Sequence, residues 1–278
     1  MTTSPQLAAI DIPSPRREAR HRLLVLHGIY GRGRNWTTLT SRFVGHCPAW
    51  SALLLDLRLH GGSPDFSPPH RVSTAAADIA AFEGATGWHA TAVMGHSFGG
   101  KVALAHAAGG HEHLEQVWVI DSTPEARPPR GSAWRLLEVV RGLPATFSTR
   151  AEATAGIQAA GYSRAVAAWM ASNLQHRGGR YVWRLDFEAM ESLLRDFFET
   201  DYWAVVESPP AGTVLHFVKA EDSGVLSDDA RMRIEAAGAR HGRTFVHGVP
   251  GGHWVHTESP DALLALLTRH LGAAPRGC

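Results

Sequence analysis

Short, almost unbroken apolar runs are the feature that most restricts how this 278-residue chain can fold. Runs of strand length without polar alternation predict strands buried on both faces, as in a parallel sheet covered by helices. We therefore expect an α/β fold with a mostly parallel, doubly wound sheet. The predicted strands lie at residues 23–26, 52–55, 92–94, 117–120, 214–218 and 245–249, and helical periodicity marks residues 35–44, 74–82, 98–108 and 262–271.

The alternation of strands and helices stops between residues 121 and 213. Roughly ninety residues there contain helix-forming segments and no convincing strand, whereas an ordinary crossover needs far fewer residues. Prolines at 124, 128 and 129 precede this stretch, and prolines at 209 and 210 follow it. We expect a core domain at residues 1–123 and 213–278 and an inserted helical cap, or lid, at residues 124–212. The alternative is a set of additional core helices.

Composition narrows the class of ligand. Lys and Arg total 27 against 26 Asp and Glu, so the net charge of +1 argues against nucleic acid as a partner.

The first twenty residues lack the apolar core of a signal peptide, and no segment is long enough to span a membrane, which predicts a cytoplasmic protein. The 17 histidines are scattered without metal-ligand spacing, so we expect neither a metal nor a cofactor. The oligomeric state is left open.

The sequence GHSFGG at residues 95–100 lies between a predicted strand and a predicted helix. This G-x-S-x-G pattern in a strand–turn–helix setting is typical of a serine nucleophile on a strained turn. The following helix begins next to the serine, so its free N–H groups favour a developing oxyanion. We predict that Ser97 is the nucleophile. The alternative is a glycine-rich turn in which Ser97 only caps the helix.

A second motif, HGIYG at residues 27–31, ends the first predicted strand. Acyl transfer requires an N–H donor in addition to the one that follows the nucleophile, and a loop at a strand end is a usual source. We predict an oxyanion hole formed by the backbone N–H groups of Ile29 and Phe98. The side chain of His27 is expected to hold the loop by hydrogen bonds, and both glycines could be simple turn residues.

The third motif, GGHWVHTESP at residues 251–260, lies between the last predicted strand and the last predicted helix. A general base at this place follows the nucleophile in the chain order of such enzymes. We predict that His253 is the base. His256 is the competing candidate, although its place at the start of a helix would direct it elsewhere.

Taken in order, HGIYG, DLRLHGGS at residues 56–63, GHSFGG and GGHWVHTESP resemble the α/β-hydrolase superfamily over nearly the whole chain. Details after these motifs, GGK at 99–101, IDSTP at 120–124 and EDS at 221–223, are similar to small bacterial esterases of the abhydrolase-domain-containing protein 11 type. The resemblance implies the α/β-hydrolase fold and hydrolysis of esters with short or medium acyl chains, acyl-CoA thioesters included.

The acid of the triad has two candidates. Most of the superfamily carries it after the seventh strand, but there this chain has Ser223 at the expected place and Asp222 one residue before it. A shift of one residue on an extended chain points the side chain to the other face. The narrower group is similar in having an Asp after the sixth strand, which corresponds to Asp121. We predict that Asp121 is the acid, with Asp222 as the alternative and Ser223 as an auxiliary hydrogen-bonding partner.

These residues predict a serine esterase or thioesterase that acts on a small-molecule acyl ester through an acyl-enzyme, with no cofactor. A cofactor-free haloperoxidase or a carbon–carbon bond hydrolase would keep the same serine and is the alternative; a non-catalytic ligand-binding protein is a second one. Arg32 and Arg34 follow the HGIYG loop. They either attract an anionic substrate such as a CoA phosphate or are solvated charges of the loop.

Overall fold

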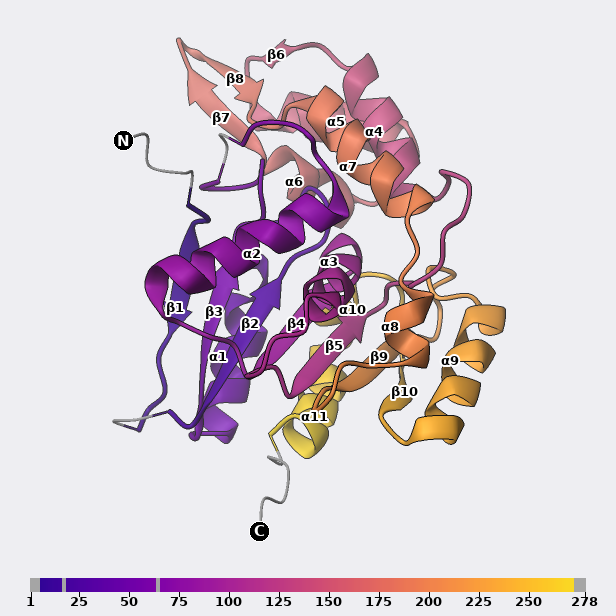
Figure 1. The fold of residues 1–278 in the computed structure, drawn as a ribbon. Coiled ribbons are helices and arrows are strands. Elements are labelled where there is room, and N and C mark those ends of the chain that lie inside the picture. The colour runs from indigo at the N-terminus through magenta and orange to yellow at the C-terminus, as the bar shows by residue number, and fades with distance from the viewer. Residues whose placement is uncertain (1–5, 17–18, 64–65, 273–278) are drawn as a thin grey trace.

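The computed structural model describes residues 6–16, 19–63 and 66–272, and a seven-stranded sheet forms its centre (Figure 1). The strand order is β1-β3-β2-β4-β5-β9-β10, with β1 antiparallel to β3 and every other neighbouring pair parallel. The predicted α/β class and all of its predicted strands are confirmed. The strands are β1 (Ala9–Ile12), β2 (His21–Leu26), β3 (Trp50–Leu55), β4 (Ala92–His96), β5 (Gln116–Ile120), β9 (Val214–Ala220) and β10 (Thr244–Val249).

Strand β1 was not predicted from the sequence. It has only four residues, AIDI, and most of them are exposed because the strand lies at the edge of the sheet. A short exposed edge strand lacks the apolar run that marks the buried strands. Its pairing with β3 is therefore set by the neighbouring strand rather than by a local pattern.

Helices cover both faces of the sheet, and β2 shows why residues 23–26 are apolar without a break. Leu23 and Val25 belong to one hydrophobic cluster, while Leu24 and Leu26 belong to the other. One face packs against α1 (Thr37–His46), α10 (Val255–Glu258) and α11 (Pro260–His270), and the other packs against α2 (Val72–Thr86), α3 (Phe98–Ala108) and α9 (Asp228–His241). The short helix η1 (Gly33–Trp36) leads into α1.

Capping residues define several of these helices. The side chain of Ser227 accepts a hydrogen bond from Ala230 N at the start of α9, as preferred N-cap residues do. Gly87 and Gly242 end α2 and α9 in the left-handed conformation, which glycine adopts without a steric cost. The layer of helices therefore follows from local signals in the sequence.

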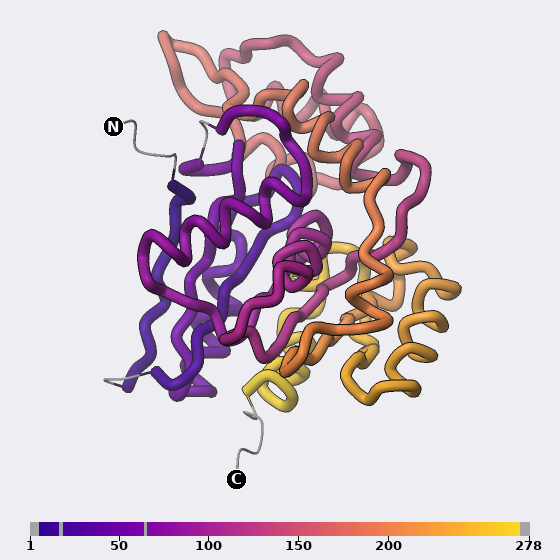
Figure 2. Tube along the Cα trace, in the orientation of Figure 1, coloured from indigo at the N-terminus to yellow at the C-terminus, as the bar shows by residue number. Residues whose placement is uncertain are grey.

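The chain between β5 and β9 forms a separate layer above the sheet (Figures 1 and 2). Its elements are α4 (Ser132–Gly142), β6 (Thr146–Phe147), α5 (Arg150–Ala159), α6 (Arg164–Ala171), β7 (Leu174–Arg177), β8 (Arg180–Trp183) and α7 (Phe187–Glu199). The trace then descends to α8 (Trp203–Glu207), which packs beside α9 rather than in the upper layer (Figure 2).

The expectation that this insertion holds no strand was wrong. Strands β6, β8 and β7 form a small antiparallel sheet, in which β7 and β8 are a hairpin. The hairpin turns at Gly178 and Gly179, whose φ angles are +56° and +78°. Two adjacent glycines between short β-forming stretches are a recognised hairpin signal, so the turn was readable from the sequence. None of the helices in the described residues combines the length and the apolar character that a membrane span requires.

Candidate active site

Ser97 lies at the tight turn between β4 and α3. Its backbone has φ 52° and ψ −116°, a conformation that costs a non-glycine residue on the order of 1–3 kcal/mol. The turn closes only because its neighbours are glycines: a Cβ on Gly95 would lie 2.0 Å from the carbonyl oxygen of Gly99. A Cβ on Gly99 would lie 2.5 Å from the carbonyl oxygen of His27. The glycines thus bring β2, β4 and α3 together and leave the strain on the serine.

Two buried histidines hold the HGIYG loop. The Nδ1 atom of His27 lies 2.7 Å from Gly28 O, and its Nε2 atom accepts a hydrogen bond from Leu57 N at 2.9 Å. The Nε2 atom of His60 accepts from Tyr30 N at 3.1 Å. Burial lowers the pKa of His27 to about 4 and that of His60 to about 3, so both rings are neutral at pH 7 and keep these acceptor atoms. His60 was not singled out in the sequence, although it belongs to the DLRLHGGS motif.

The two predicted oxyanion donors have free backbone N–H groups. Within the described part of the chain, no acceptor takes the N–H of Ile29. Phe98 is the first residue of α3, so its N–H has no partner inside the helix. Both residues line a cavity together with Ser97 and His253. The two predicted donors therefore share a cavity with the predicted nucleophile, Ser97.

Asp121 lies directly after β5 and is fully buried. Its Oδ2 atom is 2.6 Å from Nδ1 of His253, and it also accepts the hydroxyl of Ser223 at 2.6 Å. Its Oδ1 atom accepts from Ala220 N at 3.3 Å. The carboxylate therefore has partners on both oxygens, and its backbone adopts the left-handed φ of 40°.

The two alternative candidates, Asp222 for the acid and His256 for the base, take no part in the contact between Asp121 and His253. Asp222 is exposed, and its side chain makes no hydrogen bond or ion pair with any residue described. His256, on α10, stacks on Trp36 with ring centroids 4.5 Å apart, and burial lowers its pKa to about 4. Of the candidates, only Asp121 contacts His253.

Ser97 and His253 face a cavity of about 240 Å³ between the sheet and the upper layer. Helices α4 and α6 supply much of its wall, and Trp169 packs on Trp254 across it with ring centroids 4.5 Å apart. The apolar lining residues are Ile29, Ala133, Leu136, Val166, Trp169 and Trp254. A second cavity of about 50 Å³ adjoins the same serine and contains side chains of α7.

Lys101, on α3, contacts both ends of the insertion. Its side chain is fully buried, and Nζ donates to the carbonyl oxygens of Glu125 and Thr200 at 2.9 Å and to that of Phe197. Glu125 lies where the chain enters the insertion, while the other two lie at the end of α7. Burial lowers the pKa of this lysine to about 7. The sequence indicated Lys101 only as part of the GGK resemblance.

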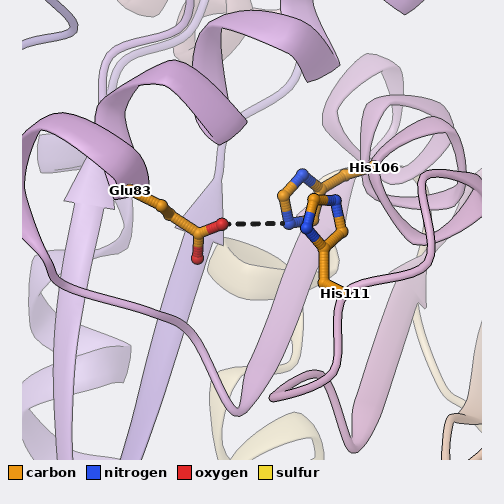
Figure 3. Close-up of side chains that lie close together, drawn as sticks. All are labelled: Glu83, His106 and His111. Atoms are coloured by element: carbon orange, nitrogen blue, oxygen red, sulfur yellow. Dashed lines mark ion pairs between the residues drawn. The ribbon is translucent and has the colours of Figure 1, made fainter.

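Away from the candidate active site, three described side chains form a group that could hold a metal ion (Figure 3). They are Glu83 on α2, His106 near the end of α3, and His111. Their ligand atoms lie within 4.8 Å of one another, and His and carboxylate donors suit Zn²⁺. The two imidazole rings are stacked, with centroids 3.9 Å apart and planes inclined by 14°, so their lone pairs run side by side rather than converge. The absence of a metal from the function stays a prediction.

Comparison of the sequence with known proteins identifies the family to which this chain belongs. A model described as the alpha/beta hydrolase family matches residues 23–266. The sn-1-specific diacylglycerol lipase ABHD11 of Danio rerio is 25% identical over 263 residues, which are 88% of this chain and 77% of that protein. Lipase LipV of Mycobacterium tuberculosis is 28% identical over 272 residues, 90% of this chain and 93% of that protein. The predicted resemblance to the ABHD11 type is confirmed.

A solved structure, a marine microorganism esterase, has the same fold. It superposes with a TM-score of 0.81 at 20% sequence identity, and the match covers 96% of this chain and 99% of the esterase. At this identity the likeness concerns the fold alone. The sheet, the flanking helices and the layer above them are therefore shared across nearly the whole chain.

Proposed function

Because this chain belongs to the alpha/beta hydrolase family, we propose that it is a serine hydrolase that cleaves carboxylic esters or acyl thioesters of short to medium acyl chain. The observation that carries the proposal is the 2.6 Å contact between Asp121 and His253 beside the cavity that Ser97 also lines. A nucleophile, a base and a buried acid in one place are the components of acyl transfer.

Because an ionised carboxylate can only accept hydrogen bonds, the contact supports the tautomer of His253 that carries its proton on Nδ1. With Nδ1–H donating to Asp121, the Nε2 lone pair is free to take the proton of Ser97 as the hydroxyl oxygen attacks the acyl carbonyl. The new C–O bond gives a tetrahedral oxyanion, which the N–H groups of Ile29 and Phe98 stabilise. Collapse breaks the bond to the leaving group, which takes the proton from Nε2. The acyl-enzyme is then hydrolysed by a water that the same nitrogen deprotonates.

Ser223 acts as a positioning residue in this scheme. Its hydroxyl donates to the same Oδ2 atom that faces His253, and it accepts from Val225 N at 3.2 Å. It holds the orientation of the carboxylate and stabilises its negative charge.

The proposed acyl-chain length follows from the cavity. About 240 Å³ is below the roughly 300–1,000 Å³ of pockets that enclose drug-sized ligands, and the wall is mainly apolar. We further propose that helices α4–α7, within the predicted cap at 124–212, act as the lid. Two observations support this: α4 and α6 line the cavity, and Lys101 anchors both ends of the insertion.

The test is hydrolysis of p-nitrophenyl esters from acetate to decanoate, with acyl thioesters in parallel, by the wild type and by Ser97→Ala. We expect the highest kcat/KM at short or medium chains and no activity in the variant. A fluorophosphonate probe should label the wild type and not Ser97→Ala.

The same experiment separates the alternatives. Labelling of Ser97 without hydrolysis of any ester or thioester would contradict the proposed substrate class and leave a haloperoxidase or a carbon–carbon bond hydrolase to be assayed. Failure to label Ser97 in a folded protein would support a non-catalytic binding protein. Either outcome overturns the esterase proposal.

A further inference from the structure

Four arginines line one groove of about 560 Å³ on the outer side of the HGIYG loop. Arg32 and Arg34 follow that loop, Arg150 begins α5, and Arg184 follows β8. They come from segments up to 152 residues apart, between positions 32 and 184, so the fold alone gathers them. Arg34, Arg150 and Arg184 are exposed.

The groove contains no carboxylate among its lining residues. None of the four guanidinium groups forms an ion pair within the described residues. Asp56 is the acid that acts to raise the pKa of Arg32, and its oxygens already accept from Gly33 N and Gly62 N at 2.7 Å. The positive charge of the groove is therefore uncompensated.

A structural role accounts for only two of these arginines. Arg32 and Arg150 donate to the carbonyl oxygens of Ser172 and Ala171, where α6 ends, and cations are favourable at a helix C-terminus. Arg34 makes no side-chain hydrogen bond with the described residues, and the side chain of Arg184 donates there only to Gly61 O, at 3.1 Å. Burial and the charge of Arg184 lower the pKa of Arg32, with Arg34 and Arg150 acting in the same direction. Like charges held together without an anion predict an anion-binding site.

The groove is connected to the active site through Asn173. Its Nδ2 atom donates to Tyr30 O at 2.8 Å, and its Oδ1 atom accepts from Arg32 Nη2 at 3.2 Å. Tyr30 lines the catalytic cavity, and Asn173 itself is buried. Asn173 thus links Arg32, which lines the groove, to Tyr30 of the HGIYG loop.

We propose that this arginine groove (Arg32, Arg34, Arg150 and Arg184) binds the phosphate groups of the leaving group, so that the preferred substrates are acyl thioesters of a phosphate-bearing thiol. The inference rests on the proposed acyl-transfer function. Planar guanidinium groups bind phosphate oxygens through paired hydrogen bonds. The groove then recognises the thiol part, while the apolar cavity receives the acyl group.

The test compares two substrates with the same acyl group: hexanoyl-coenzyme A, and hexanoyl-N-acetylcysteamine, which lacks phosphate. We expect the wild type to have a kcat/KM at least about tenfold higher for the coenzyme A thioester, mainly through KM. The advantage should shrink at 0.5 M salt, because salt screens exposed charges. The double variant Arg34→Glu/Arg184→Glu should lower this selectivity ratio at least about tenfold, and Arg34→Gln/Arg184→Gln should lower it less.

The matched control is Arg240→Glu, which reverses an exposed arginine on α9, outside the groove. It should keep the selectivity ratio of the wild type. Equal kcat/KM for the two thioesters, or a ratio that the double charge reversal does not change in a folded protein, overturns the proposal.

Calorimetric titration with adenosine 3′,5′-bisphosphate separates this inference from the proposed function. Binding to the wild type and loss of binding in the double variant, together with no hydrolysis of any ester, would leave the phosphate site standing and refute the acyl-transfer function. Ester hydrolysis without binding of the bisphosphate would support the acyl-transfer function and refute the phosphate site.

Discussion

Two carboxylate–imidazole pairs lie in different parts of this molecule. Asp121 and His253 meet at 2.6 Å where the parallel strands end, next to the start of α3. Glu83 and His106 meet at 3.5 Å beside the far end of the same helix (Figure 3). All four side chains are buried or nearly so, so burial by itself does not separate a candidate catalytic pair from a structural one.

The difference lies in what surrounds each pair. Asp121 receives Ser223 and Ala220 N in addition to His253, and His253 faces a cavity that contains Ser97. Glu83 receives only Ala90 N, at 2.8 Å, and the ring of His106 stacks on His111.

Burial raises the pKa of Glu83 and lowers that of His106 to about 3, so burial disfavours the charged form of each member of the second pair. The comparison teaches that the surroundings of the imidazole, rather than its burial, separate the two pairs: His253 lines a cavity with Ser97, whereas His106 stacks on His111.

The largest expected effect is on the first pair. Asp121→Asn should lower kcat/KM for a p-nitrophenyl ester by roughly 10⁴-fold, since an amide opposite Nδ1 favours the wrong tautomer of His253. Asp222→Asn is the matched control and should stay within about twofold of the wild type. The reverse ranking of the two variants would show that Asp222 is the acid.

Low pH should destabilise the protein through buried histidines that are not part of the predicted catalytic triad. The pKa values of His106 and His60 are lowered to about 3 and that of His27 to about 4, against 6.5 in the unfolded chain. Below pH 6.5 the unfolded state binds protons that the folded state excludes, so stability falls by up to about 1.4 kcal/mol per pH unit for each such histidine. Urea midpoints at pH 7, 6 and 5, followed by circular dichroism, measure this. A flat profile would contradict it.

Removing the auxiliary contact should have a smaller effect on catalysis. Ser223→Ala leaves Asp121 against His253 but deletes the donor at 2.6 Å, and we expect a loss of roughly 10–100-fold in kcat/KM. Ser223→Thr, which keeps the hydroxyl, should recover part of the activity. A pH profile of kcat/KM that is displaced in Ser223→Ala, while the melting temperature stays constant, would distinguish positioning from simple destabilisation.

The smallest effect is expected at the second pair. Glu83→Gln keeps an acceptor for Ala90 N and removes a buried charge, so the melting temperature should rise by a few °C at pH 7 with activity unchanged. A raised carboxyl pKa costs stability above the folded-state value, so this gain should shrink as the pH falls towards 4.5. A lower melting temperature in Glu83→Gln, together with a chelator effect on the wild type alone, would instead show a metal at Glu83, His106 and His111.

Local patterns accounted for much of the fold and of the candidate site. Apolar runs predicted six strands of the central sheet, and GHSFGG predicted the strained turn at Ser97. The edge strand β1 and the hairpin β7–β8 were missed because short, partly exposed strands carry little apolar signal. His60 and Lys101 were missed as positioning residues, since these partners lie 24 to 99 residues away.

By itself, the sequence determined the class of sheet, the strained turn at Ser97 and the motifs around it, because each depends on residues within a few positions of one another. Tertiary structure alone decided which carboxylate contacts His253: Asp121 and Ser223 are 102 residues apart, and Asp121 and His253 are 132 apart. It also gathered the arginine groove from three separate segments. Such contacts depend on how the strands and the insertion pack, and no local period records that.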